Sequence, residues 1–179
     1  GFLNAFVRNA DIVKMANMAQ LVNVIAPIFT SEDDLFLQTI YYPLQLFAKN
    51  VHGTSLDLFV DCETYSTDPF FVGLGESVTQ QDAVPFLDVS AAVSGDEVII
   101  NVVNRHKDKA ITTDVISQSG DFDGKIAVYE VNGPDVKASN TFGRTEVQTE
   151  QKDDVKAKGN VLTYSFPAHS YTQLRATLR

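Results

Sequence analysis

The feature that most constrains this chain is a short apolar run at residues 21–25, which has the pattern of a strand buried on both faces. The run reads LVNVI, and the proline at position 27 ends it. Strands of this kind belong to parallel sheets, in which helices cover both faces. A single strand makes no sheet, because its backbone groups and both of its apolar faces need neighbours. The sequence therefore predicts that polypeptide outside this chain completes the sheet.

Helical patterns flank this run. Apolar residues at helical spacing predict that the chain opens in a helix: Phe2, Leu3, Phe6 and Val7. Residues 40–49 predict a second helix with Pro43 in its first turn, where the missing N–H costs little, and Gly53 follows its end. Residues 1–53 are thus typical of one helix–strand–helix slice of a parallel α/β fold, and we assign them to a separate domain.

The pattern changes to short strands from residue 54 onward. Over residues 56–60, Leu56, Leu58 and Val60 alternate with Asp57 and Phe59. Further strands are predicted at residues 86–93, 97–104, 111–116, 126–131, 161–166 and 171–178, the last two as a hairpin. The polar stretches 62–85 and 139–159 are interpreted as long loops. Residues 54–179 therefore predict an antiparallel, jelly-roll-like β-sandwich, and the chain as a whole is expected to be mostly β.

Composition narrows the classes of partner. The formal net charge is −9, and phosphate binding needs clustered Lys and Arg, so we expect neither a nucleic-acid partner nor binding to an anionic membrane. No apolar run reaches the length of a membrane span. The one cysteine, Cys62, has no internal disulfide partner, and with only three scattered histidines it makes no zinc site; it is interpreted as a half-buried apolar residue. No metal or cofactor is expected.

Two acidic groups and one histidine–serine pair are the other candidate sites. The run at residues 32–34 suits a cation or acid–base chemistry, but a solvated loop explains it better. Asp121 and Asp123 lack the full oxygen-ligand set of a calcium site. His169 and Ser170 are assigned to turn geometry and His106 to an exposed charged turn, since no G-x-S-x-G, Walker or G-x-G-x-x-G motif is present. No catalytic residue is predicted.

The amides of Gln20 and Asn23 adjoin the predicted strand. In a parallel barrel, active-site groups come from the C-terminal ends of strands and the loops that follow. An amide buried beside such a strand is costly unless it is hydrogen-bonded. Each residue is therefore a candidate for ligand contact, with a structural amide that bonds the backbone as the alternative.

Residues 10–28 (ADIVKMANMAQLVNVIAPI) and 38–43 (QTIYYP) resemble the α-L-arabinofuranosidases of glycoside hydrolase family fifty-one. In that family the first segment contains the eighth barrel strand and the second leads into the eighth helix. The remainder resembles the family's C-terminal β-sandwich, with support from residues 102–105 and 166–171. The resemblance covers essentially the whole chain and is most specific in residues 10–43.

The resemblance implies a retaining, exo-acting hydrolase that removes terminal α-L-arabinofuranosyl groups from arabinan or arabinoxylan. Retention uses two carboxyl groups roughly 5 Å apart. In the family both are glutamates on the fourth and seventh barrel strands, which precede the segment present here. The family's substrate-binding glutamine matches Gln20, whereas Asn23 is assigned a structural role. The loop at residues 31–36 is expected near the rim of the pocket.

These implications lead to a two-chain hypothesis. An N-terminal chain of the same enzyme would carry the catalytic glutamates, complete the (β/α)8 barrel and act with this chain on an arabinose-containing polysaccharide or oligosaccharide. Secretion is expected for such an enzyme. The alternative is a non-catalytic carbohydrate-binding or structural β-sandwich, but the chain has no Trp for stacking on sugars and this alternative leaves the α/β opening unexplained.

Overall fold

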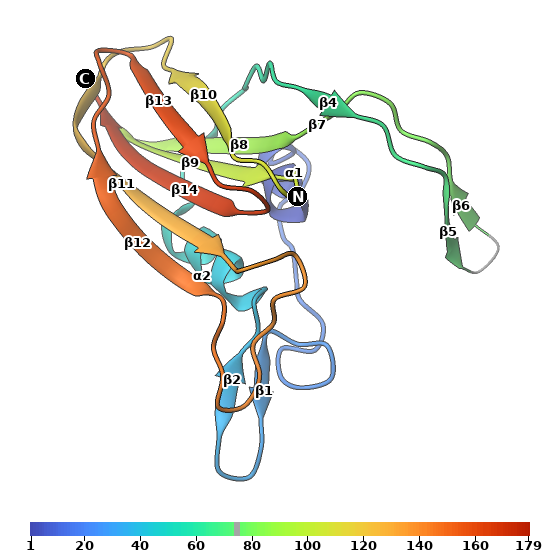
Figure 1. Cartoon of the computed structure of the whole chain (residues 1–179). Coiled ribbons are helices and arrows are strands. Elements are labelled where there is room, and N and C mark those ends of the chain that lie inside the picture. Colours follow the sequence, from blue (N-terminus) through green and yellow to red (C-terminus); the bar gives the residue numbers. More distant parts are fainter. Residues whose placement is uncertain (74–75) are drawn as a thin grey trace.

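A computed structural model describes residues 1–73 and 76–179 and shows a mostly β protein built of antiparallel sheets (Figure 1). Its helices are α1 (Phe2–Arg8) and α2 (Tyr41–Asn50), as the apolar spacing predicted. The strands are β1 (Ile28–Thr30), β2 (Leu35–Leu37), β3 (Thr54–Ser55), β4 (Thr64–Tyr65), β5 (Phe70–Gly73), β6 (Glu76–Val78), β7 (Val84–Pro85), β8 (Leu87–Ser94), β9 (Glu97–Asn104), β10 (Ile111–Ile116), β11 (Phe122–Asn132), β12 (Gln148–Val155), β13 (Val161–Phe166) and β14 (Tyr171–Leu178).

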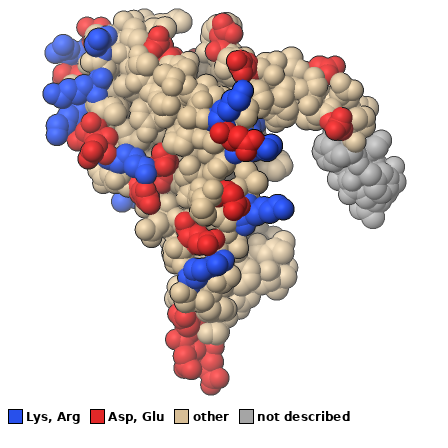
Figure 2. Space-filling model, viewed as in Figure 1, with Lys and Arg blue, Asp and Glu red and all other residues tan. Residues whose placement is uncertain are grey.

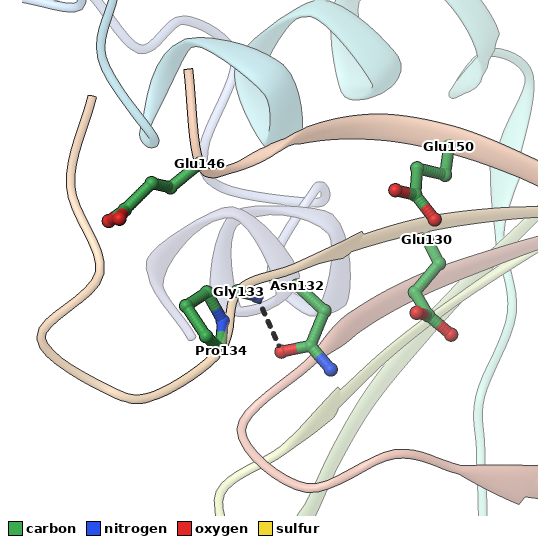
Figure 3. Close-up of a pocket in the computed structure, with 6 residues that line it drawn as sticks. All are labelled: Glu130, Asn132, Gly133, Pro134, Glu146 and Glu150. Carbon is green, nitrogen blue, oxygen red and sulfur yellow. Dashed lines mark hydrogen bonds between the residues drawn. The ribbon is translucent and has the colours of Figure 1, made fainter. Parts of the chain in front are cut away.

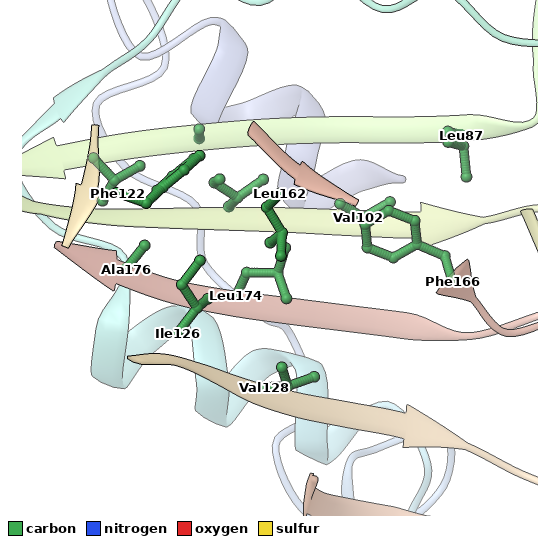
Figure 4. Packing of buried hydrophobic residues seen from close by; sticks show 12 residues of the cluster. Leu87, Val102, Phe122, Ile126, Val128, Leu162, Phe166, Leu174 and Ala176 are labelled. Carbon is green, nitrogen blue, oxygen red and sulfur yellow. The ribbon is translucent and has the colours of Figure 1, made fainter. Parts of the chain in front are cut away.

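The fold is centred on a sheet with the strand order β12-β11-β14-β9-β8-β3. The pair β10–β13 crosses one face of it, and the main hydrophobic core fills the space between (Figures 1 and 4). Phe166 and Leu162 from β13 meet Ile126 and Leu174 from the main sheet, and all four are almost fully buried. This arrangement confirms the predicted antiparallel sandwich, with one small and one large sheet.

The other face of the main sheet is covered by the two helices. Helix α1 lies on β8, and Leu46 of α2 packs against Val131 and Tyr171. Strand β9 (EVIINVVN) is therefore buried on both faces, which explains why its sequence is nearly continuously apolar rather than alternating.

Most of the predicted strands are confirmed, but their last connection is not the expected hairpin. Strand β13 pairs with β10, whereas β14 lies between β9 and β11, so the chain passes from one sheet to the other between them. His169 in this connection has a φ of 45°. The hairpin prediction was wrong because a short turn between two strands is equally compatible with a corner between packed sheets.

Strand β12 was missed and interpreted as loop. Its sequence, QTEQKDDV, is polar because it forms the edge of the main sheet and pairs only with β11. Charged residues on an edge strand discourage pairing with other chains. The stretch 62–85 was also interpreted as loop. It contains the two-stranded ribbons β4–β7 and β5–β6, which extend from the body of the molecule (Figure 1).

The alternation at residues 56–60 predicted a strand, but none forms there, because β3 ends at Ser55. Leu56 and Leu58 nevertheless turn toward the core, whereas Phe59 is 90% exposed. This segment, β10 and the main sheet line an open apolar groove of about 870 Å³. Cys62 is half-buried against the core, as predicted.

The buried strand predicted at residues 21–25 is not formed, and this prediction is wrong for the chain on its own. Val22 makes only an isolated parallel bridge with Ile28. Leu21, Val24 and Ile25 are 58%, 75% and 78% exposed. A strand buried on both faces needs neighbouring strands, and among the described residues this segment has the contact with β1 but no strand pairing along its length.

Candidate functional site

The segment that carries Gln20 is an irregular loop with a left-handed backbone. Gln20, Asn23 and Val24 have φ values of 57°, 60° and 61°. Such values are sparsely populated by residues other than glycine, and they persist only where surrounding contacts enforce them. The Gln20 side chain is exposed, so its amide is open to water and needs no protein partner in this structure.

Asn23 takes the structural role that was predicted for it. Its Oδ1 accepts a hydrogen bond from the Thr30 backbone N–H at 2.8 Å, and its Nδ2 donates to Thr30 Oγ1 at 3.1 Å. The Asn23 N–H donates to the Ile28 carbonyl at 2.8 Å. The loop that contains Gln20 is thereby tied to β1.

The acidic run at residues 32–34 forms the tip of the β1–β2 hairpin. Figure 2 shows these carboxylates as the red end of the lower projection, and their side chains are exposed. Ser31 Oγ accepts the Asp34 N–H at 3.1 Å and the Ser31 N–H donates to the Asp34 carbonyl at 2.8 Å, so the run serves a turn. The interpretation as a solvated loop therefore fits.

Three glutamates line a shallow pocket of about 300 Å³ next to β11 and β12: Glu130, Glu146 and Glu150 (Figure 3). Glu130 and Glu150 are direct cross-strand partners, and Lys152 reaches both, at 3.3 Å and 2.6 Å. Hydrogen bonding to Glu150, and then the charge of Glu130, raises the pKa of Lys152. A carboxylate pair bridged by a lysine is an ion cluster that ties the edge strand to its neighbour.

The other candidate residues also serve structure. His169 N–H donates to the His106 carbonyl at 2.9 Å, and Ser170 Oγ donates to the Pro167 carbonyl at 2.7 Å. His106 is not simply exposed as expected: its ring lies 4.8 Å from that of Phe86, and its Nδ1 accepts two backbone N–H groups. Asp123 faces Arg179 at 3.5 Å.

A buried chain of amides and hydroxyls, which was not predicted, joins α1 to α2 across the main sheet. Ser90, Asn101 and Gln173 sit side by side on β8, β9 and β14. Ser90 Oγ donates to Asn4 Oδ1 of α1 at 2.9 Å, and Asn101 Nδ2 donates to Ser90 Oγ at 3.3 Å. Gln173 Nε2 donates to Asn101 Oδ1 at 2.9 Å and Gln173 Oε1 accepts from Asn50 Nδ2 of α2.

An ion pair reinforces α1 at the start of this chain. Asp88 on β8 is 4% exposed and faces Arg8 of α1 at 2.7 Å and Arg105 at 3.1 Å. Asn4 Nδ2 also donates to the Asp88 carbonyl at 2.8 Å. The two helices of residues 1–53 are thus held to the sandwich by specific polar contacts as well as by packing.

The ionisation of the Tyr171 hydroxyl makes the free energy of unfolding of the chain depend on pH. Burial raises the pKa of Tyr171 far above its usual range, while its hydroxyl donates to Asn101 Oδ1 at 2.9 Å. The unfolded chain ionises its tyrosines from about pH 10, whereas the folded state keeps this proton. The stabilisation is therefore complete below that pH and is lost as the pH rises above it.

We expect the urea midpoint of the chain to fall as the pH rises from about 9 to 11, and to fall less steeply in a Tyr171→Phe variant. A smaller decline remains in the variant, because the pKa values of Tyr42, Tyr164 and Lys152 are also raised. Equal slopes for the two proteins contradict this account.

Neither a metal-binding cluster nor a membrane-spanning helix is present in residues 1–73 and 76–179. No group of three or more His, Cys, Asp or Glu in these ranges lies in an arrangement that holds a metal ion. Of the helices in the same ranges, none combines the length and apolar character needed to cross a membrane.

Known proteins are similar to this chain in sequence and in fold over nearly its whole length. The probable α-L-arabinofuranosidase C of Aspergillus clavatus is 40% identical over 97% of the chain, and the intracellular exo-α-(1→5)-L-arabinofuranosidase 1 of Bacillus subtilis is 30% identical over 97%. The α-L-arabinofuranosidase of Thermotoga maritima, solved as an arabinose complex, superposes with a TM-score of 0.87 at 27% identity, over 98% of this chain and 36% of its own.

The chain spans about a third of the length of these relatives: 32% of the Aspergillus clavatus protein and 33% of the Bacillus subtilis protein. The family model of the α-L-arabinofuranosidase C-terminal domain matches residues 1–170 of the sequence. This match confirms the resemblance found in residues 10–43, and the chain therefore belongs to the family of α-L-arabinofuranosidase C-terminal domains.

Proposed function

We propose that this chain is the C-terminal portion of a retaining, exo-acting α-L-arabinofuranosidase that releases terminal α-L-arabinofuranosyl groups from arabinan or arabinoxylan. The similarity to a probable arabinofuranosidase over 97% of the chain carries the proposal. In a retaining reaction one carboxyl group attacks the anomeric carbon while the other protonates the leaving oxygen and then activates water. Both glutamates belong, in this proposal, to the N-terminal portion of the enzyme.

An exposed apolar segment supports contact with that N-terminal portion. Large hydrophobic side chains are exposed along residues 12–25: Ile12, Met15, Met18, Leu21, Val22, Val24 and Ile25. Contiguous apolar surface of this kind marks an interface with other polypeptide. The remaining strands of a (β/α)8 barrel would pair with this segment and cover it, and in the two-chain form of the proposal this contact holds the pieces together. Secretion stays a prediction, and the Bacillus subtilis relative is named an intracellular enzyme.

Gln20 is the substrate contact that we assign to this chain. Its exposed amide offers two N–H donors and a carbonyl acceptor, which match the hydroxyl groups of a sugar ring. A neutral amide binds such hydroxyls without altering the charges of the catalytic carboxyl groups, and it helps to hold the ring near its reactive geometry.

Replacement of Gln20 by alanine tests this role in the enzyme that contains both portions. We expect kcat/KM for 4-nitrophenyl α-L-arabinofuranoside to fall about tenfold, the loss of roughly one hydrogen bond to the substrate. The matched control is Gln118→Ala, because Gln118 is also an exposed amide but lies after β10. An unchanged kcat/KM in Gln20→Ala, or an equal loss in the control, overturns the assignment.

A further inference from the structure

We propose that the loop joining β11 to β12, residues 133–147, positions the sugar-binding segment of this enzyme. The loop holds the β1–β2 hairpin through Asn140, and the hairpin in turn fixes the segment that carries Gln20. The inference rests on the proposed function, because it is there that Gln20 is assigned to the sugar. In this proposal the β-sandwich contributes to substrate binding as well as to structural support.

Asn140 is the centre of this contact. It is 1% exposed, although it lies in a loop. Its Oδ1 accepts the N–H groups of Glu146 and Val147, each at 2.9 Å, which shapes the loop itself. Its Nδ2 donates to the Val147 carbonyl at 2.7 Å and, across to the hairpin, to the Leu37 carbonyl of β2 at 2.8 Å. The hydrogen-bonding capacity of this amide is thus fully used.

Two further contacts join the loop to the same hairpin. The Asn140 N–H donates to Gln38 Oε1 at 3.3 Å. The ring of Phe142 meets the ring of Phe36 edge-on at 4.8 Å, and Phe36 stacks on Phe29 of β1 at 4.9 Å. Figure 1 shows the orange loop running down beside β1 and β2.

The hairpin needs such support because each of its strands has only three residues. An isolated two-stranded hairpin is marginally stable in water. From β1 the contact continues toward Gln20: Asn23 is bonded to Thr30 and Ile28, and the Gln38 N–H donates to the Pro27 carbonyl at 2.8 Å. Gln20 lies three residues before Asn23, in the same irregular loop, and both residues have a positive φ. Loss of the Asn140 contact therefore releases the support of that stretch.

Hydrogen exchange of the 179-residue chain tests the contact without relying on catalysis. In Asn140→Ala we expect the amides of residues 23–37 to exchange about tenfold faster. The matched control is Asn104→Ala: Asn104 is also 1% exposed, and its Nδ2 donates to the carbonyls of Lys109, Phe166 and Pro167, away from the hairpin. Equal exchange at residues 23–37 in the two variants overturns the proposal.

Phe142→Ala is a second variant, which keeps the proposal testable if Asn140→Ala does not fold. Phe142 is 46% exposed, so its loss costs the sandwich little, yet it removes the aromatic contact with β2. Faster exchange in the hairpin with an unchanged melting temperature supports the proposal, and unchanged hairpin exchange speaks against it.

Kinetics of the complete enzyme then test positioning. We expect Asn140→Ala to raise KM for 4-nitrophenyl α-L-arabinofuranoside about fivefold with kcat within about twofold, and Asn104→Ala to change neither. Adding Asn140→Ala to Gln20→Ala should raise KM no further, since coupled residues are not additive. An additive increase overturns positioning through Gln20. If Gln20→Ala alone has no effect, the proposed function fails, and the exchange comparison still decides whether the loop holds the hairpin.

Discussion

Replacement of Phe166 by alanine is expected to lower the free energy of unfolding of the chain by about 3–5 kcal/mol. Phe166 is 1% exposed and projects from β13 into the core between the two sheets (Figure 4). Within the described residues the second sheet consists of β10 and β13, so it depends on side-chain packing to stay on the main sheet. The site also borders the open groove lined by Leu87 and Val102, which limits how far neighbours can close over the lost ring.

Urea unfolding followed by circular dichroism measures this loss. The matched control is Phe59→Ala, because Phe59 has the same side chain but is 90% exposed, and its removal should change the free energy by no more than about 0.5 kcal/mol. A loss below about 1 kcal/mol in Phe166→Ala is incompatible with a ring that holds the two sheets together.

The sandwich was predictable from sequence wherever a strand has an apolar face. Strands β9, β10, β13 and β14 have the predicted bounds, because each places apolar side chains on the core at a regular period. Strand β12 gave no such signal, since an edge strand with charged side chains looks like a loop in composition. Between β13 and β14 the chain passes from the small sheet to the main sheet. This change of sheet was not predictable, because it depends on packing partners far away in the sequence.

The segment around Gln20 illustrates a different limit. Its apolar pattern indicated a buried strand, but a strand forms only where neighbours pair with it, and in this chain the segment is exposed. The pattern reports the surroundings for which the sequence is suited, and in the proposed function the N-terminal portion of the enzyme provides them. Gln20 was a candidate because its amide adjoins the predicted strand, and the family resemblance then assigned it to the substrate. Asn140 had no local signal, because its partners Leu37 and Gln38 lie about a hundred residues away in the sequence.

Asn101 was detectable in the sequence, because it is a polar residue in the middle of the apolar strand EVIINVVN. An amide in the middle of a buried strand must find partners on its neighbours. The structure provides them through Ser90 and Gln173, which lie directly opposite Asn101 on the adjacent strands. This interruption of an apolar run was the available sign of the buried chain that joins the two helices.

Replacement of Asn101 by alanine should therefore cost about 3 kcal/mol, because it leaves the buried Tyr171 hydroxyl and Gln173 amide without their shared acceptor. The matched control is Asn160→Ala, since Asn160 is an exposed amide with one hydrogen bond to the Ser117 carbonyl, and we expect a loss of at most about 1 kcal/mol. Urea unfolding measures both values.

A double-mutant cycle separates the network from simple loss of volume. Tyr171→Phe removes the hydroxyl that depends on Asn101, and it also removes the second acceptor of Gln173 Nε2, the Tyr171 hydroxyl oxygen at 3.0 Å. The costs of the two replacements should therefore depart from additivity by about 1 kcal/mol. Full additivity would show that Asn101 acts by packing alone. Because the chain of hydrogen bonds runs from Asn4 of α1 to Asn50 of α2, the same variant should also speed amide exchange in both helices. Faster exchange in both would identify Asn101 as the link through which the main sheet holds the two helices together.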